Sequence, residues 1–322
     1  MQISGEKHRY ARAPAAARSR SCVARAACGL ALGVALAGCN SMHRYAADKL
    51  GDTLAAGGTT YASDNDPDLI KAAAPFSLKL MESVLQETPQ HAGLLTAAAG
   101  GFTEYAYAFV GEDGDEAESR DLQASVALHH RAMLLYVRGR GYGMRALEAR
   151  HPNFQEKLRS TQGAAAAELD ASDATALYWT AAAWAAAISL DKDSADAVAD
   201  LPLVDALLMR LKVLDPDYDH GALDSLLMSW EGARIGVRDP QQQVRVHFER
   251  AVKLSAGQKA GPYVTFAEVA CVKSQDRRQF TAMLQQALAI DPALRPQWQL
   301  ENLLMQRRAR WLLTQTDQLF IE

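Results

Sequence analysis

Apolar residues recur along this chain at the spacing of an α-helix. Residues at i, i+4 and i+8 fall on one helix face, whereas a half-buried strand would alternate apolar and polar positions. The sequence contains no run of β-branched residues with a period of two. Three stripes with helical spacing are Phe76, Leu80 and Val84; Leu203, Leu207 and Leu211; and Phe280, Leu284 and Leu288. The pattern predicts an all-α protein.

Two segments are apolar on every side. Ala174 to Leu190 contains no charged residue, and Leu94 to Val110 contains only Glu104. A helix that is apolar all round is a buried one. We therefore expect these two helices at the centre of the domain, with their alanines allowing neighbouring helices to approach closely.

The second of these segments carries a carboxylate inside an aromatic cluster. An unpaired buried carboxylate would be costly, and Arg138, Arg140 or Arg145 could compensate Glu104. One interpretation is an aromatic core with one buried ion pair. The other is a cavity or channel with a polar group beside aromatic walls, the usual composition of a ligand site. The cluster consists of Phe102, Tyr105, Tyr107 and Phe109.

A repeat is visible where helices end. Leu214, Leu254 and Ile290 each close an apolar stripe, and they lie 40 and 36 positions apart. This spacing is close to the roughly 34-residue period of tetratricopeptide (TPR) repeats. The sequence therefore predicts a TPR-like array of helical hairpins.

The folded region has a clear start. Asp66 is a good N-cap residue and Pro67 suits the first helical position. Before it, residues 39–62 read as a tether with one short helix, Ala46 to Ala55, broken by Gly57 and Gly58. We assign residues 63–322 to one helical domain.

The N-terminus is built like a bacterial export signal. A basic stretch is followed by the apolar run Ala26 to Ala37, and Leu36 to Cys39 spell L-A-G-C, which resembles the lipobox of bacterial lipoproteins. The alternative, an uncleaved membrane helix, would need about 20 apolar residues. We expect residues 1–38 to be removed as a signal peptide and Cys39 to be lipidated.

Removal of residues 1–38 takes away six basic residues and one acidic residue. The remainder carries 28 basic and 37 acidic side chains, a formal charge of −9. Such a charge disfavours electrostatic binding to nucleic acid or anionic lipid, so the lipid has to provide membrane attachment. Cys271 is then the only cysteine besides Cys39, and no internal disulfide is expected.

Recognised catalytic motifs are missing from the sequence. There is no H-E-x-x-H, no G-x-S-x-G and no P-loop, so we expect no enzymatic activity, cofactor or metal. His129 and His130 are adjacent and would diverge on a helix. Gly139, Gly141 and Gly143 lack a preceding strand and are expected to permit a close helix crossing. Residues 111–121 read as a solvated acidic connection.

Several segments resemble the TatT family, T-component lipoproteins associated with tripartite ATP-independent periplasmic (TRAP) transporters. The resemblance implies a periplasmic helical domain with TPR-like motifs and a central cleft or pore. It also implies a homo-oligomer, a trimer, that docks a solute-binding protein and handles a hydrophobic ligand. The segments are Gly57–Gly58, Tyr61–Leu69, Ala74–Phe76, Gly101–Val110, Leu135–Gly143 and Tyr178–Trp184.

The expected function is that of a non-enzymatic accessory of TRAP-type uptake. The alternative is a TPR scaffold lipoprotein for outer-membrane or envelope assembly. Asn40 rather than Asp after the lipidated cysteine favours the periplasmic face of the outer membrane. Side chains on the two apolar helices are the expected ligand-binding groups: Phe102, Glu104, Tyr105, Tyr178, Trp179 and Trp184.

Overall fold

The computed structural model describes residues 44–233 and 239–321, and within these ranges the chain forms helices and no strand. The prediction of an all-α protein is therefore confirmed. The compact unit spans Lys49–Glu322, so it begins inside the segment 39–62 that reads as a tether. Cys39 and the predicted signal peptide lie outside the described residues.

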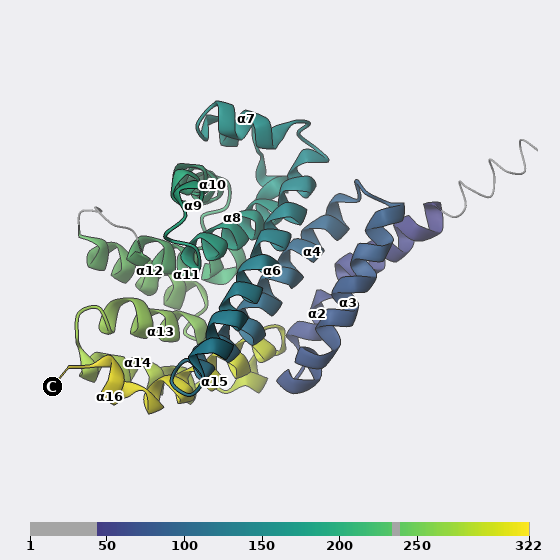
Figure 1. Cartoon of the computed structure of the whole chain (residues 1–322). Helices are drawn as coiled ribbons and strands as arrows, with labels where there is room; N and C mark the ends of the chain where they lie inside the picture. The colour runs from purple at the N-terminus through teal and green to yellow at the C-terminus, as the bar shows by residue number, and fades with distance from the viewer. Residues whose placement is uncertain (1–43, 234–238, 322) are drawn as a thin grey trace, which may run out of the picture. The chain divides into compact units, whose positions relative to one another are not determined.

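The first half of the unit forms a bundle around α8, and residues 49–56 are also helical. Figure 1 shows α4, α6 and α8 running side by side, with α3 beside α4. Its elements are α2 (Gly58–Ala62), α3 (Pro67–Glu87), α4 (Ala92–Tyr105), η1 (Ala106–Gly111), α5 (Glu112–Glu118), α6 (Leu122–Glu148), α7 (Phe154–Ser160), η2 (Ala164–Glu168), η3 (Ala171–Asp173), α8 (Ala174–Ser189), α9 (Ala195–Ala199) and α10 (Leu201–Leu214).

The second half continues as consecutive helices that pack against one another (Figure 1). A second core holds this half together, with Phe248 stacked on Phe266 at 4.4 Å between ring centroids and Phe280 meeting Phe320 at 5.0 Å. Its elements are α11 (Tyr218–Ala233), α12 (Pro240–Leu254), α13 (Gly261–Phe266), η4 (Ala267–Cys271), α14 (Arg277–Ala289), η5 (Pro292–Leu294), η6 (Pro296–Trp298), α15 (Gln299–Thr314) and α16 (Thr316–Leu319).

Aspartate caps begin several of these helices. The Asp66 side chain accepts hydrogen bonds from the backbone N–H groups of Asp68 and Leu69 at 3.1 and 3.0 Å, and Pro67 occupies the first helical position. The helix start predicted at Asp66 is confirmed, whereas the compact unit begins earlier, at Lys49. Because the first N–H groups of a helix have no partner inside it, such a cap fixes where the helix begins. Asp121 and Asp276 cap α6 and α14 in the same way.

Glycines on α6 allow its close crossing with α4 and α8. A Cβ atom on Gly139 would lie 2.8 Å from Thr103 Oγ1, and one on Gly143 would overlap Thr180. Gly141 faces open space instead, with no neighbouring atom within 4 Å of a built Cβ. The predicted close crossing is confirmed for two of the three glycines.

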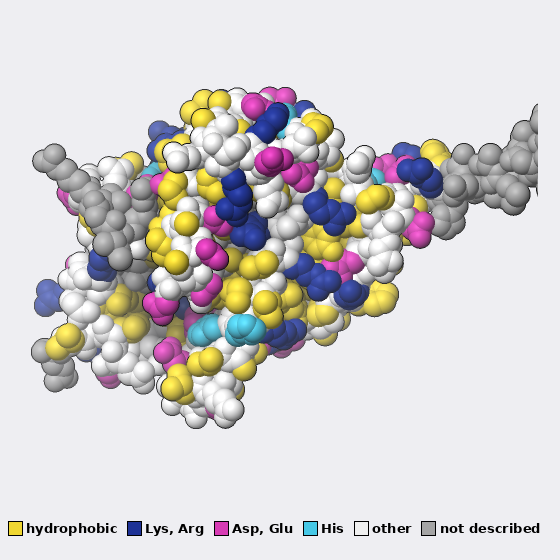
Figure 2. Space-filling view, turned by 45° about the horizontal axis from the view of Figure 1, so that its top comes forward, with side chains coloured by type: hydrophobic (Ala, Val, Ile, Leu, Met, Phe, Trp, Pro, Cys, Tyr) yellow, Lys and Arg dark blue, Asp and Glu magenta, His cyan; other side chains and the backbone are white. Residues whose placement is uncertain are grey.

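Two buried aspartates in the bundle are each held by several partners. Asp200 accepts two hydrogen bonds from Arg159, at 2.7 and 3.1 Å, and one from Trp184 Nε1 at 3.2 Å. Asp173 binds Arg150 and His151 at 2.7 and 2.9 Å. Buried charges are tolerated where they are paired and hydrogen-bonded, so these aspartates fasten the connections between helices. Figure 2 shows basic and acidic side chains close together on one face as well.

The acidic segment 111–121 was predicted as a solvated connection, and this prediction is wrong. Most of it forms α5, with Glu112 and Gly114 buried. Ion pairs join α5 to α15: Arg308 lies 2.7 Å from Asp115, and Arg307 lies 3.3 Å from Glu116. The acidic charge attaches the first half of the unit to the last long helix.

Candidate functional site

The structure separates the six expected ligand-binding residues into two groups. Phe102, Tyr105 and Trp184 are buried, and Trp184 is only 2% exposed. Phe102 stacks on Tyr142 at 5.6 Å between ring centroids. These three aromatic side chains pack the core of the bundle. Glu104, Tyr178 and Trp179 form the other group, because all three side chains remain accessible to solvent.

Glu104 is not compensated by any of the three expected arginines. Arg138 pairs with Glu82, Arg140 lies 3.8 Å from Asp200, and Arg145 donates to the backbone carbonyl of Pro89. The interpretation as a buried ion pair with one of them is therefore wrong. The spacing on α6 places these side chains on faces that do not meet α4 at this residue.

Glu104 is both accessible and strongly desolvated. Its side chain is exposed, yet burial among protein atoms, reinforced by Glu301 and Asp219, raises the pKa of its carboxyl to about 7. A side chain on a convex surface loses little hydration, and its pKa changes little. We infer from this combination that Glu104 lies on the wall of a recess that water enters and protein surrounds.

Three further side chains show the same combination. Tyr107 is 47% exposed, although burial raises the pKa of its hydroxyl group far above the ordinary value. Glu301 and Glu268 are partly accessible, and burial is the main cause of the raised pKa of each carboxyl group. These residues come from η1, α15 and η4. We infer a recess between α4 and η1 on one side and the C-terminal helices on the other.

One end of the recess is acidic around a single ammonium group. Lys259 Nζ lies 3.2 Å from Glu301 Oε2 and 3.3 Å from Asp219 Oδ2. Burial lowers the pKa of Lys259, but Glu301 and Asp219 outweigh burial and leave it above the ordinary value. The ammonium also lies 5.4 Å from the centroid of the Trp298 ring. Lys259 is therefore protonated, and its ammonium group is paired with the carboxylates of Glu301 and Asp219.

Aromatic rings surround this acidic end. Tyr178 stacks on Tyr218 at 4.7 Å and meets the edge of Trp179 at 4.9 Å between ring centroids. Burial raises the pKa of Tyr178, with further contributions from Tyr218, Asp219, Glu301 and Glu104. Tyr178 therefore lies among the same carboxylates as Glu104.

A turn with an unusual backbone positions Asp219 at this end. Asp219, His220 and Gly221 have φ values of 40°, 53° and 97°. Left-handed backbone is costly for residues other than glycine and tends to occur at functional positions. A Cβ on Gly221 would lie 2.8 Å from the Cα of Ala251, so only glycine fits there. The rings of His220 and Trp298 meet edge to face, with 5.2 Å between their centroids.

The other end of the recess is built on two π-helical turns, η1 and η4. Such turns are frequent at functional sites because they shift side chains out of the regular helical register. Tyr107 lies on η1 and Glu268 on η4. Arg308 donates to Glu268 Oε1 at 3.0 and 2.7 Å, and its guanidinium lies 4.4 Å from the Trp311 ring centroid.

Glu112 adds a buried carboxyl beside this end. Its side chain is 4% exposed, and its Oε1 atom has no hydrogen-bond partner among the described residues. Burial raises its pKa to about 8, although Arg308 and Arg307 act in the opposite direction. The carboxyl is therefore mostly protonated at neutral pH.

Sequence reasoning found Glu104 and the aromatic residues of α8, but it missed the charged residues opposite them. Glu301 and Arg308 lie seven positions apart and thus share one face of α15. This spacing is the one feature of the sequence that could have indicated the opposite wall. It does not indicate a site by itself, because charged residues seven positions apart are ordinary on an exposed helix.

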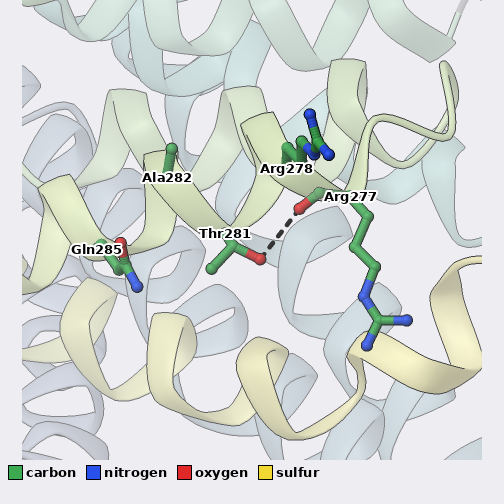
Figure 3. A pocket seen from close by; sticks show the side chains of 5 residues that line it. All are labelled: Arg277, Arg278, Thr281, Ala282 and Gln285. Atoms are coloured by element: carbon green, nitrogen blue, oxygen red, sulfur yellow. Dashed lines mark hydrogen bonds between the residues drawn. The ribbon is translucent and has the colours of Figure 1, made fainter.

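The described ranges also bear on two other kinds of site. They contain no group of three or more His, Cys, Asp or Glu side chains arranged for a metal ion. The depression drawn in Figure 3 is open and lies on α14, where the Thr281 hydroxyl donates to the Arg277 carbonyl oxygen at 3.0 Å. Its lining residues are Arg277, Arg278, Thr281, Ala282 and Gln285, none of which belongs to the recess.

Comparison with known proteins identifies the family. The model of the TRAP transporter T-component family matches residues 63–320. The chain belongs to this family. It is also 27% identical over 267 residues to an uncharacterized protein of Treponema pallidum (strain Nichols), covering 81% of this chain and 83% of that protein.

Family membership makes this protein an accessory component of TRAP transport. The family consists of transport accessories and is not a known enzyme family. None of the helices in residues 44–233 and 239–321 is long and apolar enough to cross a membrane.

Proposed function

We propose that this protein is a non-enzymatic accessory that binds a periplasmic solute-binding protein of a TRAP transporter and holds a small, largely apolar ligand in the recess. The observation that carries the proposal is Glu104, an accessible carboxylate surrounded by protein, together with the aromatic wall of Tyr178 and Trp179. Pockets that combine apolar walls with a few convergent polar groups are typical ligand sites.

The alternative, a scaffold for envelope assembly, accounts less well for the recess. A scaffold needs an outer surface, and desolvated carboxylates inside it would only reduce stability. Ionisable groups with strongly perturbed pKa values cluster at functional sites. Glu104, Glu112, Glu268 and Glu301 all have raised pKa values in this one region.

The proposal includes membrane attachment through Cys39. The L-A-G-C sequence at residues 36–39 supports lipidation, and Asn40 favours the periplasmic face of the outer membrane. We further propose a homotrimer. Cys39→Ala is expected to release the protein from the membrane fraction or leave it unprocessed, as judged by fractionation and mass spectrometry of the N-terminus. Normal processing and membrane partition of this variant would contradict the proposal.

The central test is purification of the tagged protein from its own cells, followed by mass spectrometry of bound proteins and small molecules. We expect a TRAP solute-binding protein and a small apolar molecule. Tyr178→Leu is expected to lose the small molecule and retain the solute-binding protein. Phe76→Leu is the matched control, since Phe76 is 73% exposed on α3. Recovery of envelope-assembly factors without either expected component would favour the scaffold.

A further inference from the structure

The acidic end of the recess contains more negative charge than its own cation balances. Glu104, Asp219 and Glu301 face Lys259, and the Lys259 ammonium is already engaged by Asp219 and Glu301. Within the described residues, no hydrogen bond or ion pair reaches the Glu104 carboxylate, which only senses the other charges at a distance. Glu104 is thus the free charged group of the recess.

The positive charge at the opposite end is also paired. Arg308 forms ion pairs with Glu268 and Asp115, each at 2.7 Å, although its Nη1 atom makes no hydrogen bond within the described residues. Lys259 and Arg308 are therefore each held by two carboxylates. An anionic ligand would meet unpaired negative charge at Glu104 and would have to compete for the cations that carboxylates already hold.

The aromatic wall of the recess also favours a positively charged ligand. The faces of Trp and Tyr rings attract cations, with Trp the most favourable. The Tyr178 ring contacts both Trp179 and Tyr218, and a Cβ atom on Gly100, one helical turn before Glu104 on α4, would lie 2.9 Å from the Trp179 ring. The pKa of Tyr178 is also raised by Asp219, Glu301 and Glu104. Apolar ring surface and unpaired carboxylate thus lie together, and this pair of features suits a ligand with an apolar body and a positively charged group.

We propose that the recess binds an organic cation, a protonated amine on an apolar or aromatic body, with the ammonium at Glu104 and the body against Tyr178 and Trp179. This proposal rests on the proposed function, because it names the chemical class of the ligand held in the same recess. A cation at this place also removes the cost of the unpaired carboxylate, since an opposite charge nearby favours the ionised form.

Three small probes of matched shape test the sign of the charge. They are 2-phenylethylamine, 3-phenylpropionate and the neutral 2-phenylethanol, titrated into the purified full-length protein at pH 8 by isothermal titration calorimetry. We expect the amine to bind at least tenfold more tightly than either of the others. Glu104→Gln should reduce amine affinity at least tenfold and leave the affinity for the alcohol unchanged. Glu118→Gln, which removes an exposed carboxylate of α5, should leave all three affinities unchanged.

A pH titration adds an independent readout. The pKa of Glu104 is raised to about 7 by burial, Glu301 and Asp219, with Lys259 opposing them. Glu104 is therefore ionised at pH 8 and mostly protonated at pH 5.5. Affinity for the amine should fall over this range in the wild-type protein and much less in Glu104→Gln.

The outcomes separate this inference from the function on which it rests. Equal or tighter binding of the carboxylate or the alcohol overturns the preference for a cation and leaves an apolar ligand site in place. Unchanged amine affinity in Glu104→Gln overturns the role of Glu104. Failure of all three probes overturns the inference, while co-purification of a solute-binding protein would still support the partner role.

Discussion

Trp184 and Trp179 lie on the same helix, α8, in opposite surroundings. Trp184 is 2% exposed, donates from Nε1 to Asp200 and has the Arg140 guanidinium 5.0 Å from its ring centroid. Trp179 remains accessible beside Tyr178 in the recess. A helix without charged residues thus serves two purposes: one face closes a core, and another provides the wall of a recess.

The carboxylates of the two regions differ in the same way. Asp200 accepts hydrogen bonds from Arg159 and Trp184, and its position is fixed by them. Glu104 has no such partner in the described part of the chain, and its pKa is raised by burial. A satisfied buried charge maintains the fold, whereas an accessible charge without a partner is available to a ligand.

The largest effect is expected from removing Trp184. Trp184→Ala should reduce the free energy of unfolding by about 3–5 kcal/mol, the range for deleting a large buried aromatic side chain. Denaturant unfolding followed by circular dichroism measures this loss. Trp179→Ala is the matched variant and should cost clearly less, because its ring is only partly enclosed. Equal losses for the two variants would remove the distinction between core and recess.

The pH dependence of stability tests the buried carboxyl of Glu112, which, like Glu104, lacks a full set of partners. Because burial raises its pKa from 4.5 to about 8, the folded state favours the protonated form. This stabilising contribution is fully present below pH 4.5 and is lost as the pH rises from 4.5 to about 8. Glu112→Gln removes this dependence, so the variant should gain stability relative to the wild type as the pH rises. Between pH 5.5 and pH 9 the relative gain should be up to about 3 kcal/mol, since one pKa unit corresponds to about 1.4 kcal/mol.

The thermal unfolding midpoint of both proteins between pH 5.5 and 9 provides the measurement. The charged groups facing Glu112 are Arg307, Arg308, Glu268 and Glu116. Parallel pH profiles for wild type and variant would show that Glu112 does not titrate in this range.

A smaller effect is expected at two glycines of α6. Gly143→Ala should destabilise the protein by about 1–3 kcal/mol, because the added methyl group overlaps Thr180 in a packed crossing. Gly141→Ala should stabilise it by about 0.5–1 kcal/mol, since alanine favours a helix and open space surrounds that position. The same sign for both variants would contradict the assignment of the two faces.

Much of the fold could be predicted from local patterns. The period of the apolar residues indicated helices, Asp66 and Pro67 marked the start of α3, and the absence of charge in residues 174–190 indicated the central position of α8. These features depend on neighbours along the chain. Residues 111–121 were misread because their acidic composition is typical of a solvated loop, whereas Arg307 and Arg308, far away in sequence, hold them as a helix.

Only one wall of the recess could be predicted from the sequence. Glu104 was conspicuous because it interrupts an apolar helix, and so were the rings at Tyr178 and Trp179. The opposite wall consists of Lys259, Glu301 and Arg308, whose surroundings are set by the packing of distant helices. The three candidate arginines on α6 were wrong for the same reason: spacing in sequence did not reveal which helix faces α4.

The most direct test of the central claim is to compare wild type with Glu104→Gln at pH 8, measuring both the stability and the small molecule retained during purification. If Glu104 serves a ligand rather than the fold, the variant should be at least as stable as the wild type, because an unpaired desolvated charge has been removed. It should also lose the retained molecule. A destabilised variant that retains the same molecule in the same amount would contradict the account.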